Sequence, residues 1–328
     1  MAEYKGIKGF KVQYLSADPS DPNIGQTWYN DTSKDLKYTS VTTAGAWATG
    51  NNMGTARYAL AGAGTQTAGL AFGGYVGPPG ATGATEAYDG TSWSPGGSLN
   101  TGRYSDAGAG TQTAGLVFGG TTGTGFATTT EEYDGSSWAI SPGSLNTQRQ
   151  QLGAAGIQTA ALAFGGYITA ETAVTEEYNG TSWASNPTGL NTIRRQLAGC
   201  GTQTAALAFG GRNPPGTDLG STEEYNGSAW TTVNSMNTAR NKLAGAGTQT
   251  AAVGFGGTPP TTGATEEYDG SSWTTSPASL GTARYGLAGA GTQASALGFG
   301  GYTGTTLLTA TEEWTGSGVA LTKTITVS

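Results

Sequence analysis

The sequence has 328 residues, a formal net charge of -7, 57 glycines and only 11% charged residues. Clustered lysine and arginine supply most nonspecific affinity for nucleic acids, so this acidic balance argues against a nucleic-acid partner. The chain has no histidine and a single cysteine, which excludes histidine-dependent catalytic triads, histidine metal sites and an intrachain disulfide.

The composition predicts a fold made of strands and turns. Thr, Ser, Gly and Ala dominate, whereas the bulky aromatics are 8 Trp and 15 Tyr, a mixture that suits β-structure better than helices. No N-terminal stretch has the charged-then-apolar pattern of a signal peptide, and no run of about 18 apolar residues could span a bilayer. We therefore expect an all-β protein without membrane insertion.

Residues 1–46 do not fit the rest of the chain and predict a short N-terminal β arm. Residues 10–15 (FKVQYL) alternate like a strand, residues 16–25 are rich in turn formers, and GQTWYND followed by LKYTS predicts a small hairpin. This segment resembles the N-terminal segments of bacteriophage tail-fibre and other virion structural proteins. The resemblance implies an arm that contacts other virion proteins, in a chain that is a homo-oligomer in the particle.

The remainder is dominated by six copies of one unit, spaced 44 to 46 residues apart. Each copy opens with an arginine, has a glutamine nine residues later, and continues with a glycine pair and a TEEYDG-like stretch. A tryptophan follows the tyrosine by five residues except in the last copy. The expected framework residues are Arg57, Arg103, Arg149, Arg194, Arg240 and Arg284, with Trp47, Trp93, Trp138, Trp183, Trp230 and Trp273.

Each unit predicts four antiparallel strands. The first begins near the arginine and passes through LAGAG, and the second is TAALAFGG or its equivalent. Asp-Gly or Asn-Gly after the tyrosine predicts a hairpin between the third and fourth strands. Six such sheets favour radial closure, because the small residues early in the unit suit a crowded axis and the later aromatics suit widening wedges. A solenoid of stacked sheets is the alternative.

The letters FGG, EEYDG and SSW resemble the kelch repeat over residues 57 to 319. This resemblance implies a six-bladed kelch-like β-propeller. Trp47 lies ten residues before Arg57, just as Trp93 lies ten before Arg103, so we expect the Trp47 segment to supply the outer strand of the last blade. The propeller would then span 47–319, leaving a C-terminal tail strand at 320–328. The alternative is that this tail is itself the outer strand.

The repeated carboxylates predict structure rather than catalysis. A pair such as Glu131-Glu132 has the residue types of a glycosidase, but neighbours on a strand face opposite ways and every blade carries the same signature. We expect the glutamates to pair with the arginine column, and the alternative is an arginine ring lining an anion-binding channel. GAGTQTAG lacks the helix that a phosphate loop needs, and Cys200 takes an alanine slot. No enzyme, cofactor or metal is predicted.

Binding is expected at the loops that vary. In a four-stranded antiparallel blade, the link after the second strand and the link to the next blade lie on one face, opposite the constant GTQ and DGSS turns. Variable loops on a rigid scaffold are the usual place for recognition, with solvated loops of no function as the alternative. The expected contact residues are Tyr75, Phe126, Tyr167, Arg212, Asp218 and Tyr302.

These inferences converge on a noncatalytic phage virion surface protein, of tail-fibre or appendage type, located in the virion. Its propeller would recognise a host-surface glycan or protein. The alternative is a purely architectural virion component, such as a capsid decoration or tail structural protein.

Overall fold

The computed structural model describes residues 12–20, 25–41, 44–78, 80–318 and 320–325. All regular elements in these ranges are β-strands, which confirms the all-β prediction. The chain divides into two compact units: Ala46–Thr315, and a smaller unit formed by Met1–Gly45 with Gly316–Ser328. No helix in the described ranges is long and apolar enough to cross a membrane.

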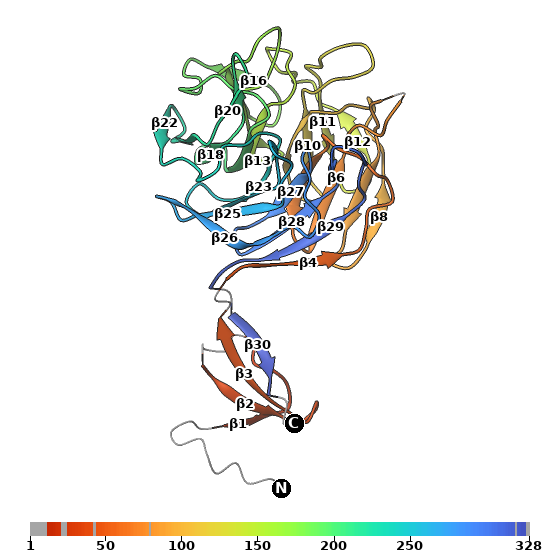
Figure 1. Cartoon of the computed structure of the whole chain (residues 1–328). Helices are drawn as coiled ribbons and strands as arrows, with labels where there is room; N and C mark the ends of the chain where they lie inside the picture. The colour runs from red at the N-terminus through yellow and green to blue at the C-terminus, as the bar shows by residue number, and fades with distance from the viewer. Residues whose placement is uncertain (1–11, 21–24, 42–43, 79, 319, 326–328) are drawn as a thin grey trace. The chain divides into compact units, whose positions relative to one another are not determined.

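The larger unit contains six four-stranded antiparallel sheets, one for each repeat (Figure 1). We number them as blades 1 to 6, from the innermost strand outward within each. Blades 1 to 3 are β5 (Ala61–Thr65), β6 (Ala68–Phe72), β7 (Thr85–Tyr88), β8 (Trp93–Gly96); β9 (Ala107–Gly110), β10 (Gly115–Phe118), β11 (Thr130–Tyr133), β12 (Trp138–Ile140); and β13 (Gly153–Ile157), β14 (Ala160–Phe164), β15 (Thr175–Tyr178), β16 (Trp183–Asn186).

Blades 4 to 6 follow the same plan, and blade 4 also carries a two-stranded ribbon between its second and third strands. Their strands are β17 (Ala198–Gly201), β18 (Ala206–Phe209), β21 (Thr222–Tyr225), β22 (Trp230–Val233); β23 (Ala244–Gly247), β24 (Ala252–Phe255), β25 (Ala264–Tyr268), β26 (Trp273–Ser279); and β27 (Ala288–Gly291), β28 (Ser295–Phe299), β29 (Thr311–Thr315), β4 (Ala46–Gly50). The ribbon is β19 (Arg212–Asn213) with β20 (Thr217–Asp218).

The sheets close into a ring through their inner strands. Each inner strand lies beside that of the next blade, and β27 of blade 6 lies beside β5 of blade 1. The residue two positions before each inner strand donates its backbone N–H to the carbonyl of its equivalent in the preceding blade, with N to O distances of 2.6 to 2.8 Å. We call these the axial residues: Ala59, Ser105, Gln151, Gln196, Lys242 and Gly286. Because the six bonds return to their starting point, the larger unit is a β-propeller with these sheets as its blades.

The last blade takes its outer strand from the N-terminal side of the chain. β4 pairs antiparallel with β29, and Trp47 lies opposite Trp314. The Trp47 ring packs edge-on against Phe255 of blade 5, with centroids 4.8 Å apart. The C-terminal strand β30 (Ala320–Thr324) pairs instead with β3 (Asp35–Val41) of the smaller unit. The first strand of the propeller, β4, is therefore paired with its last strand, β29, within blade 6.

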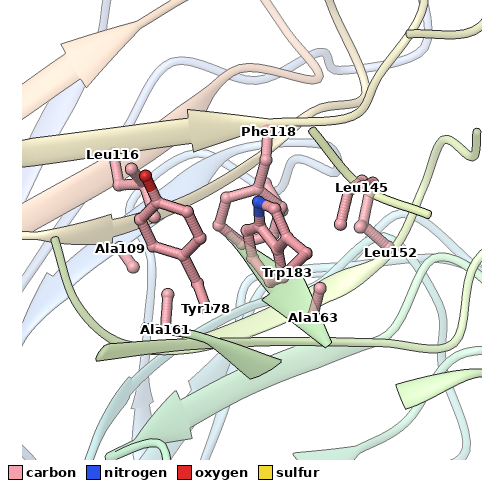
Figure 2. Close-up of a cluster of buried hydrophobic side chains, with 10 residues drawn as sticks. Ala109, Leu116, Phe118, Leu145, Leu152, Ala161, Ala163, Tyr178 and Trp183 are labelled. Atoms are coloured by element: carbon pink, nitrogen blue, oxygen red, sulfur yellow. The ribbon is translucent and has the colours of Figure 1, made fainter. Parts of the chain in front are cut away.

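Aromatic side chains fill the wedges between blades. Figure 2 shows the interface of blades 2 and 3, where Trp183 lies 4.7 Å from the Phe118 ring and donates its Nε1–H to Thr130 Oγ1 at 2.9 Å. The same Phe–Trp contact and Trp–Thr hydrogen bond recur at all six interfaces. Buried indole N–H groups need a partner, so one repeated threonine satisfies each tryptophan.

Close approach of the inner strands explains why they consist mainly of small residues, as in the Ala-Gly-Ala-Gly of β9. A Cβ added at Gly199 of β17 would lie 2.6 Å from the Ala154 carbonyl oxygen in the neighbouring blade. A real side chain could not enter that space without moving the backbone. Small residues at the axis are therefore a requirement of ring closure.

The smaller unit is a four-stranded sheet with order β1-β2-β3-β30. It contains β1 (Gln13–Leu15), parallel to β2 (Thr27–Asn30), and β2 forms the expected hairpin with β3. Residues 10–11 of the predicted first strand, residues 21–24 of the turn-rich segment and residues 326–328 of the tail lie outside the described residues.

One carboxylate organises this sheet. Asp18 accepts hydrogen bonds from Trp28 Nε1 at 3.0 Å and Asn30 Nδ2 at 2.7 Å, and Lys37 Nζ lies 2.7 Å away. Hydrogen bonds from Lys37, Asn30 and Trp28 lower the pKa of Asp18 to about 2. The ionised side chain of Asp18 therefore links the WYN residues of β2 to the LK residues of β3.

Candidate ligand-binding site

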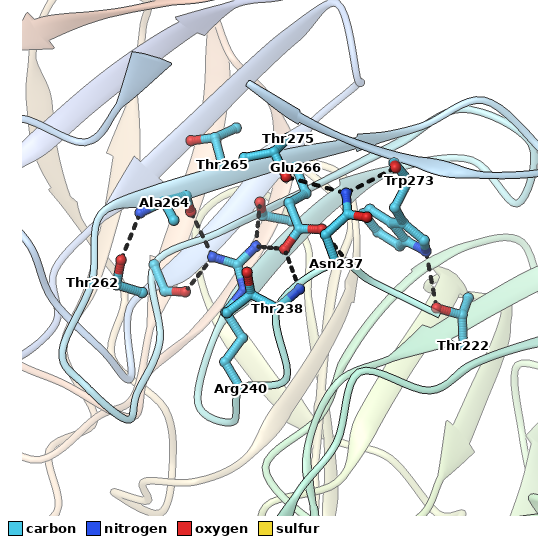
Figure 3. Close-up of polar contacts among 12 residues, drawn as sticks. Thr222, Asn237, Thr238, Arg240, Thr262, Ala264, Thr265, Glu266, Trp273 and Thr275 are labelled. Atoms are coloured by element: carbon cyan, nitrogen blue, oxygen red, sulfur yellow. Dashed lines mark hydrogen bonds and ion pairs between the residues drawn. The ribbon is translucent and has the colours of Figure 1, made fainter. Parts of the chain in front are cut away.

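The arginine of each repeat belongs to a buried framework, illustrated by blade 5 in Figure 3. Arg240 Nη2 lies 3.1 Å from Glu266 Oε1, and Nη1 donates to the Ala264 carbonyl at 2.7 Å. Glu266 Oε2 accepts the backbone N–H of Asn237 at 2.7 Å. Burial lowers the pKa of Arg240, and Glu266 opposes that effect. The pair ties the linker that enters a blade to the third strand of that blade.

All six repeats contain this ion pair, and each arginine side chain is at most 1% exposed. Such burial excludes a ring of arginines lining a channel. Buried pairs fix register more reliably than they add stability, since desolvation offsets much of the attraction. The pairs are Arg57–Glu86, Arg103–Glu131, Arg149–Glu176, Arg194–Glu223, Arg240–Glu266 and Arg284–Glu312.

The second glutamate and the glutamine connect neighbouring blades. Tyr178 of blade 3 donates its hydroxyl to Glu132 of blade 2 at 2.5 Å, and Gln203 of blade 4 donates to the Tyr178 carbonyl at 2.6 Å. Equivalent tyrosine bonds reach Glu313, Glu177 and Glu224, and every repeat has the glutamine contact. The paired glutamates thus serve as structural acceptors, which gives no support to a glycosidase.

The linkers and the variable loops share one face of the propeller. The residue after each framework arginine forms a β-bridge with the residue after the glycine pair of the same repeat. We call this the variable face. The bridges are Tyr58–Tyr75, Tyr104–Thr121, Gln150–Tyr167, Arg195–Arg212, Asn241–Thr258 and Tyr285–Tyr302.

A cavity of about 160 Å³ opens at the axis of the variable face. We call it the axial cup. The axial residues line it, together with Tyr58, Tyr104 and leucines that precede the inner strands, such as Leu60. Below it, the axis is lined by the small residues of the inner strands. The cup is therefore bordered by the parts of the repeats that differ from blade to blade.

The backbone around the cup is strained in a way that singles it out. All six axial residues have φ between 53° and 62°, yet only one of them is glycine. Other residues reach this left-handed region at a steric cost that glycine avoids. Residues held in such conformations cluster at functional sites. Gln151, Gln196 and Lys242 thus place side chains at positions where glycine would fit the backbone better.

Tyrosines dominate one side of the variable face. Five rings follow one another in an arc, with successive centroids 5.4, 5.5, 5.5 and 5.6 Å apart. Burial and the neighbouring tyrosines raise the pKa of Tyr58, so its hydroxyl stays protonated and can donate. The tyrosine arc consists, in order, of Tyr104, Tyr75, Tyr58, Tyr302 and Tyr285.

Cations gather on the side next to the arc. Lys242 Nζ lies 4.9 Å from the centre of the Tyr285 ring, and Arg195 lies 4.7 Å above the Tyr167 ring. Burial lowers the pKa of Lys242, and the charges of Arg195 and Arg212 lower it further. The ring of similar blades therefore presents an unequal surface, aromatic on one side and positive on the other.

Asp106 interrupts the ring of leucines below the axial residues. The other five repeats have leucine at this position, each 5 to 7% exposed. Burial raises the pKa of Asp106 to about 8, despite the opposing charges of Arg103 and Arg57. Neither carboxyl oxygen has a hydrogen bond to another described residue. The carboxyl lies against Gly73 of blade 1, within the blade interface.

The residues expected to bind ligand lie on the variable face but outside the lining of the cup. Tyr75 and Tyr302 both contact the ring of Tyr58. The ring centroids of Phe126 and Tyr167 lie 6.2 Å apart, and Arg195 lies over the Tyr167 ring. Arg212 and Asp218 are opposite each other in the β19–β20 ribbon, where Asp218 accepts a hydrogen bond from Asn241. The structure thus places them around the cup, with Tyr75 and Tyr302 nearest to it.

Sequence reasoning missed the cup itself, because the first strand was expected to begin near the arginine. The inner strand of blade 1 starts at Ala61, and the residues before it turn toward the axis instead. A signal was present: the two residues after each arginine differ among repeats within a stretch of constant length. Because the residue type changes there while the length stays constant, Tyr58, Tyr104 and Lys242 could have been recognised as variable positions on a constant framework.

Other chemistry has little support in the described part of the chain. No cluster of three or more His, Cys, Asp or Glu side chains there could hold a metal ion. Cys200 is buried, which raises the pKa of its thiol to about 12. No protein-family model matches the sequence, and a search of curated proteins also finds no match.

Proposed function

We propose that this protein is a noncatalytic virion surface protein of a bacteriophage, which uses the variable face of its propeller to bind a host-surface glycan. The phage setting rests on the resemblance of the N-terminal arm to tail-fibre segments. The binding role rests on the axial cup. Its single strongest support is that five axial residues keep side chains in a conformation that glycine adopts without steric cost.

The tyrosine arc favours a glycan as the ligand. Tyrosine offers a flat apolar ring and a hydroxyl at its tip, so it stacks on a sugar ring and hydrogen-bonds the hydroxyls around it. Tyr58 and Tyr104 line the cup, and the flanking rings extend this surface outward. A host-surface protein is the second ligand class, and an architectural role would bury the same residues against another virion subunit.

The test is adsorption of the purified protein to host cells and to an array of bacterial surface glycans. We expect the double variant Tyr58→Ala/Tyr104→Ala to lose at least tenfold in affinity while keeping the thermal unfolding temperature of the propeller within a few degrees. Tyr14→Ala is the matched control, because Tyr14 is 79% exposed in the smaller unit. Unchanged binding by the double variant would contradict the proposal, and burial of the cup in the intact particle would favour the architectural role.

A further inference from the structure

We infer that the axial cup takes an acidic saccharide, with the anionic group at Lys242 and the sugar ring on the tyrosine arc. This inference rests on the proposed function and adds a ligand class to it. The shared chemistry is a pyranose that carries a negative charge, as a carboxylate or a sulfate ester.

Charge is the first argument. The whole chain has a formal charge of -7, yet Lys242, Arg195 and Arg212 lie close enough on this face for both arginines to lower the pKa of the lysine. Neither Lys242 nor Arg212 forms an ion pair with a described residue; Arg212 Nε donates to the Gly216 carbonyl at 2.9 Å. A half-buried cation without a counter-ion is stabilised by an anion that enters beside it.

The carboxylates on this face leave that charge unneutralised. Glu171 lies 3.2 Å from Arg195 Nε and compensates it. Asp218 accepts a hydrogen bond from Asn241, across the ribbon from Arg212. Asp106 lines the cup but is mostly protonated at neutral pH, because burial raises its pKa to about 8. An incoming anion therefore meets Lys242 as the uncompensated charge of the cup.

Geometry is the second argument. Lys242 Nζ is 4.9 Å from the centre of the Tyr285 ring, and Tyr285 is the end of the tyrosine arc that continues through Tyr302 to Tyr58. An anion bound at the ammonium thus brings the ring that bears it over aromatic faces. The side chains of Gln151 and Gln196, which line the same cup, offer amide donors and acceptors for sugar hydroxyls.

Space for the Tyr58 ring depends on a local glycine. A Cβ added at Gly286 would lie 3.0 Å from Tyr58 Cδ2, so the one glycine among the axial residues occurs where the Tyr58 ring leans over the backbone. Lys242 is the next axial residue around the ring, since Gly286 N donates to its carbonyl. The aromatic and cationic parts of the cup are therefore direct neighbours.

The experiment uses the full chain and an array of matched oligosaccharides. Each uronic-acid-containing oligosaccharide is paired with its carboxyl-reduced form, and with a sulfated derivative of that reduced form. Isothermal titration then compares the wild-type protein with Lys242→Gln and Arg212→Gln. Lys34→Gln is the control, because it removes the same charge from an exposed site in the smaller unit.

We expect the anionic forms to bind at least tenfold more tightly than the reduced forms, with affinity falling as salt is raised. Lys242→Gln should remove most of that preference, Arg212→Gln a smaller part, and Lys34→Gln none. Preference for only the carboxylated or only the sulfated member supports the inference and identifies the anion. Equal binding of reduced forms, still sensitive to Tyr58→Ala, overturns the acidic class while leaving the proposed function standing. No binding by any probe, with no adsorption to host cells, contradicts both.

Discussion

Replacing Asp106 with leucine should stabilise the propeller, because the carboxyl occupies a place built for an apolar side chain. Asp106 is 8% exposed, both of its oxygens lack hydrogen bonds to other described residues, and burial raises its pKa from 3.8 to about 8. Each pKa unit corresponds to about 1.4 kcal/mol. At pH 7 the unfolded chain has lost the proton that the folded chain retains, so the roughly three units from 3.8 to 7 give an upper estimate of about 4 kcal/mol.

The pH dependence separates this explanation from simple packing. The ionisation cost of a carboxyl with a raised folded pKa is absent only well below pH 3.8, where both states are protonated, and it grows as pH rises to about 8. Urea unfolding at pH 4, 6 and 8 should therefore show a widening stability gap between Asp106→Leu and wild type. Asp106→Asn should show the same widening of the stability gap with pH, but it should lack the extra stability that the apolar leucine side chain gives at pH 4. Parallel stability profiles for wild type and Asp106→Asn would show that the carboxyl at position 106 does not have a raised pKa in the folded protein.

Three further predictions concern the framework and the axis. Arg240→Met leaves the Glu266 carboxylate buried without its guanidinium partner, so urea unfolding should show that the free energy of unfolding falls by about 3–5 kcal/mol. Adding Glu266→Gln should recover part of that free energy. A fall below about 1 kcal/mol would argue against the framework role of the pair. Gln196→Gly removes the strain of a left-handed backbone at φ 57° and should raise the free energy of unfolding by about 0.5–1 kcal/mol. Gly286→Ala should lower it. The reverse order of melting temperatures would count against backbone strain at the axis. Because burial raises the pKa of the Cys200 thiol to about 12, mass spectrometry should detect no alkylation by iodoacetamide at pH 8 until the protein is unfolded, and rapid labelling of native protein would show that this site opens.

Much of the fold could be predicted because the same residue types recur at the same spacing in every repeat. Tight-turn signals and the fixed spacing of aromatic residues located the strands, and six copies of the unit match the six four-stranded sheets of the larger unit. The two roles of the paired glutamates could not be separated from the sequence. Glu131 bonds an arginine within its blade, whereas Glu132 accepts from Tyr178 of the next blade, and only the geometry distinguishes them.

The candidate site was harder to predict for a physical reason. Glycine is the usual sign of a positive φ, but Ala59, Ser105 and Gln151 adopt it without being glycine. The closed ring of backbone hydrogen bonds imposes that conformation from outside the local sequence. The variable loops lie on the face where the cup opens, but the residues that line the cup belong to the linkers, whose path to the axis could not be predicted from the sequence.

Oxidative footprinting of the protein alone and saturated with an array-selected glycan would show directly which part of the surface a ligand covers. We expect protection of Tyr58 and Tyr104 in the axial cup, with Tyr14 of the smaller unit unchanged. Protection confined to the GTQ and DGSS turns of the opposite face, with Tyr58 and Tyr104 still oxidised at their free rates, would contradict it.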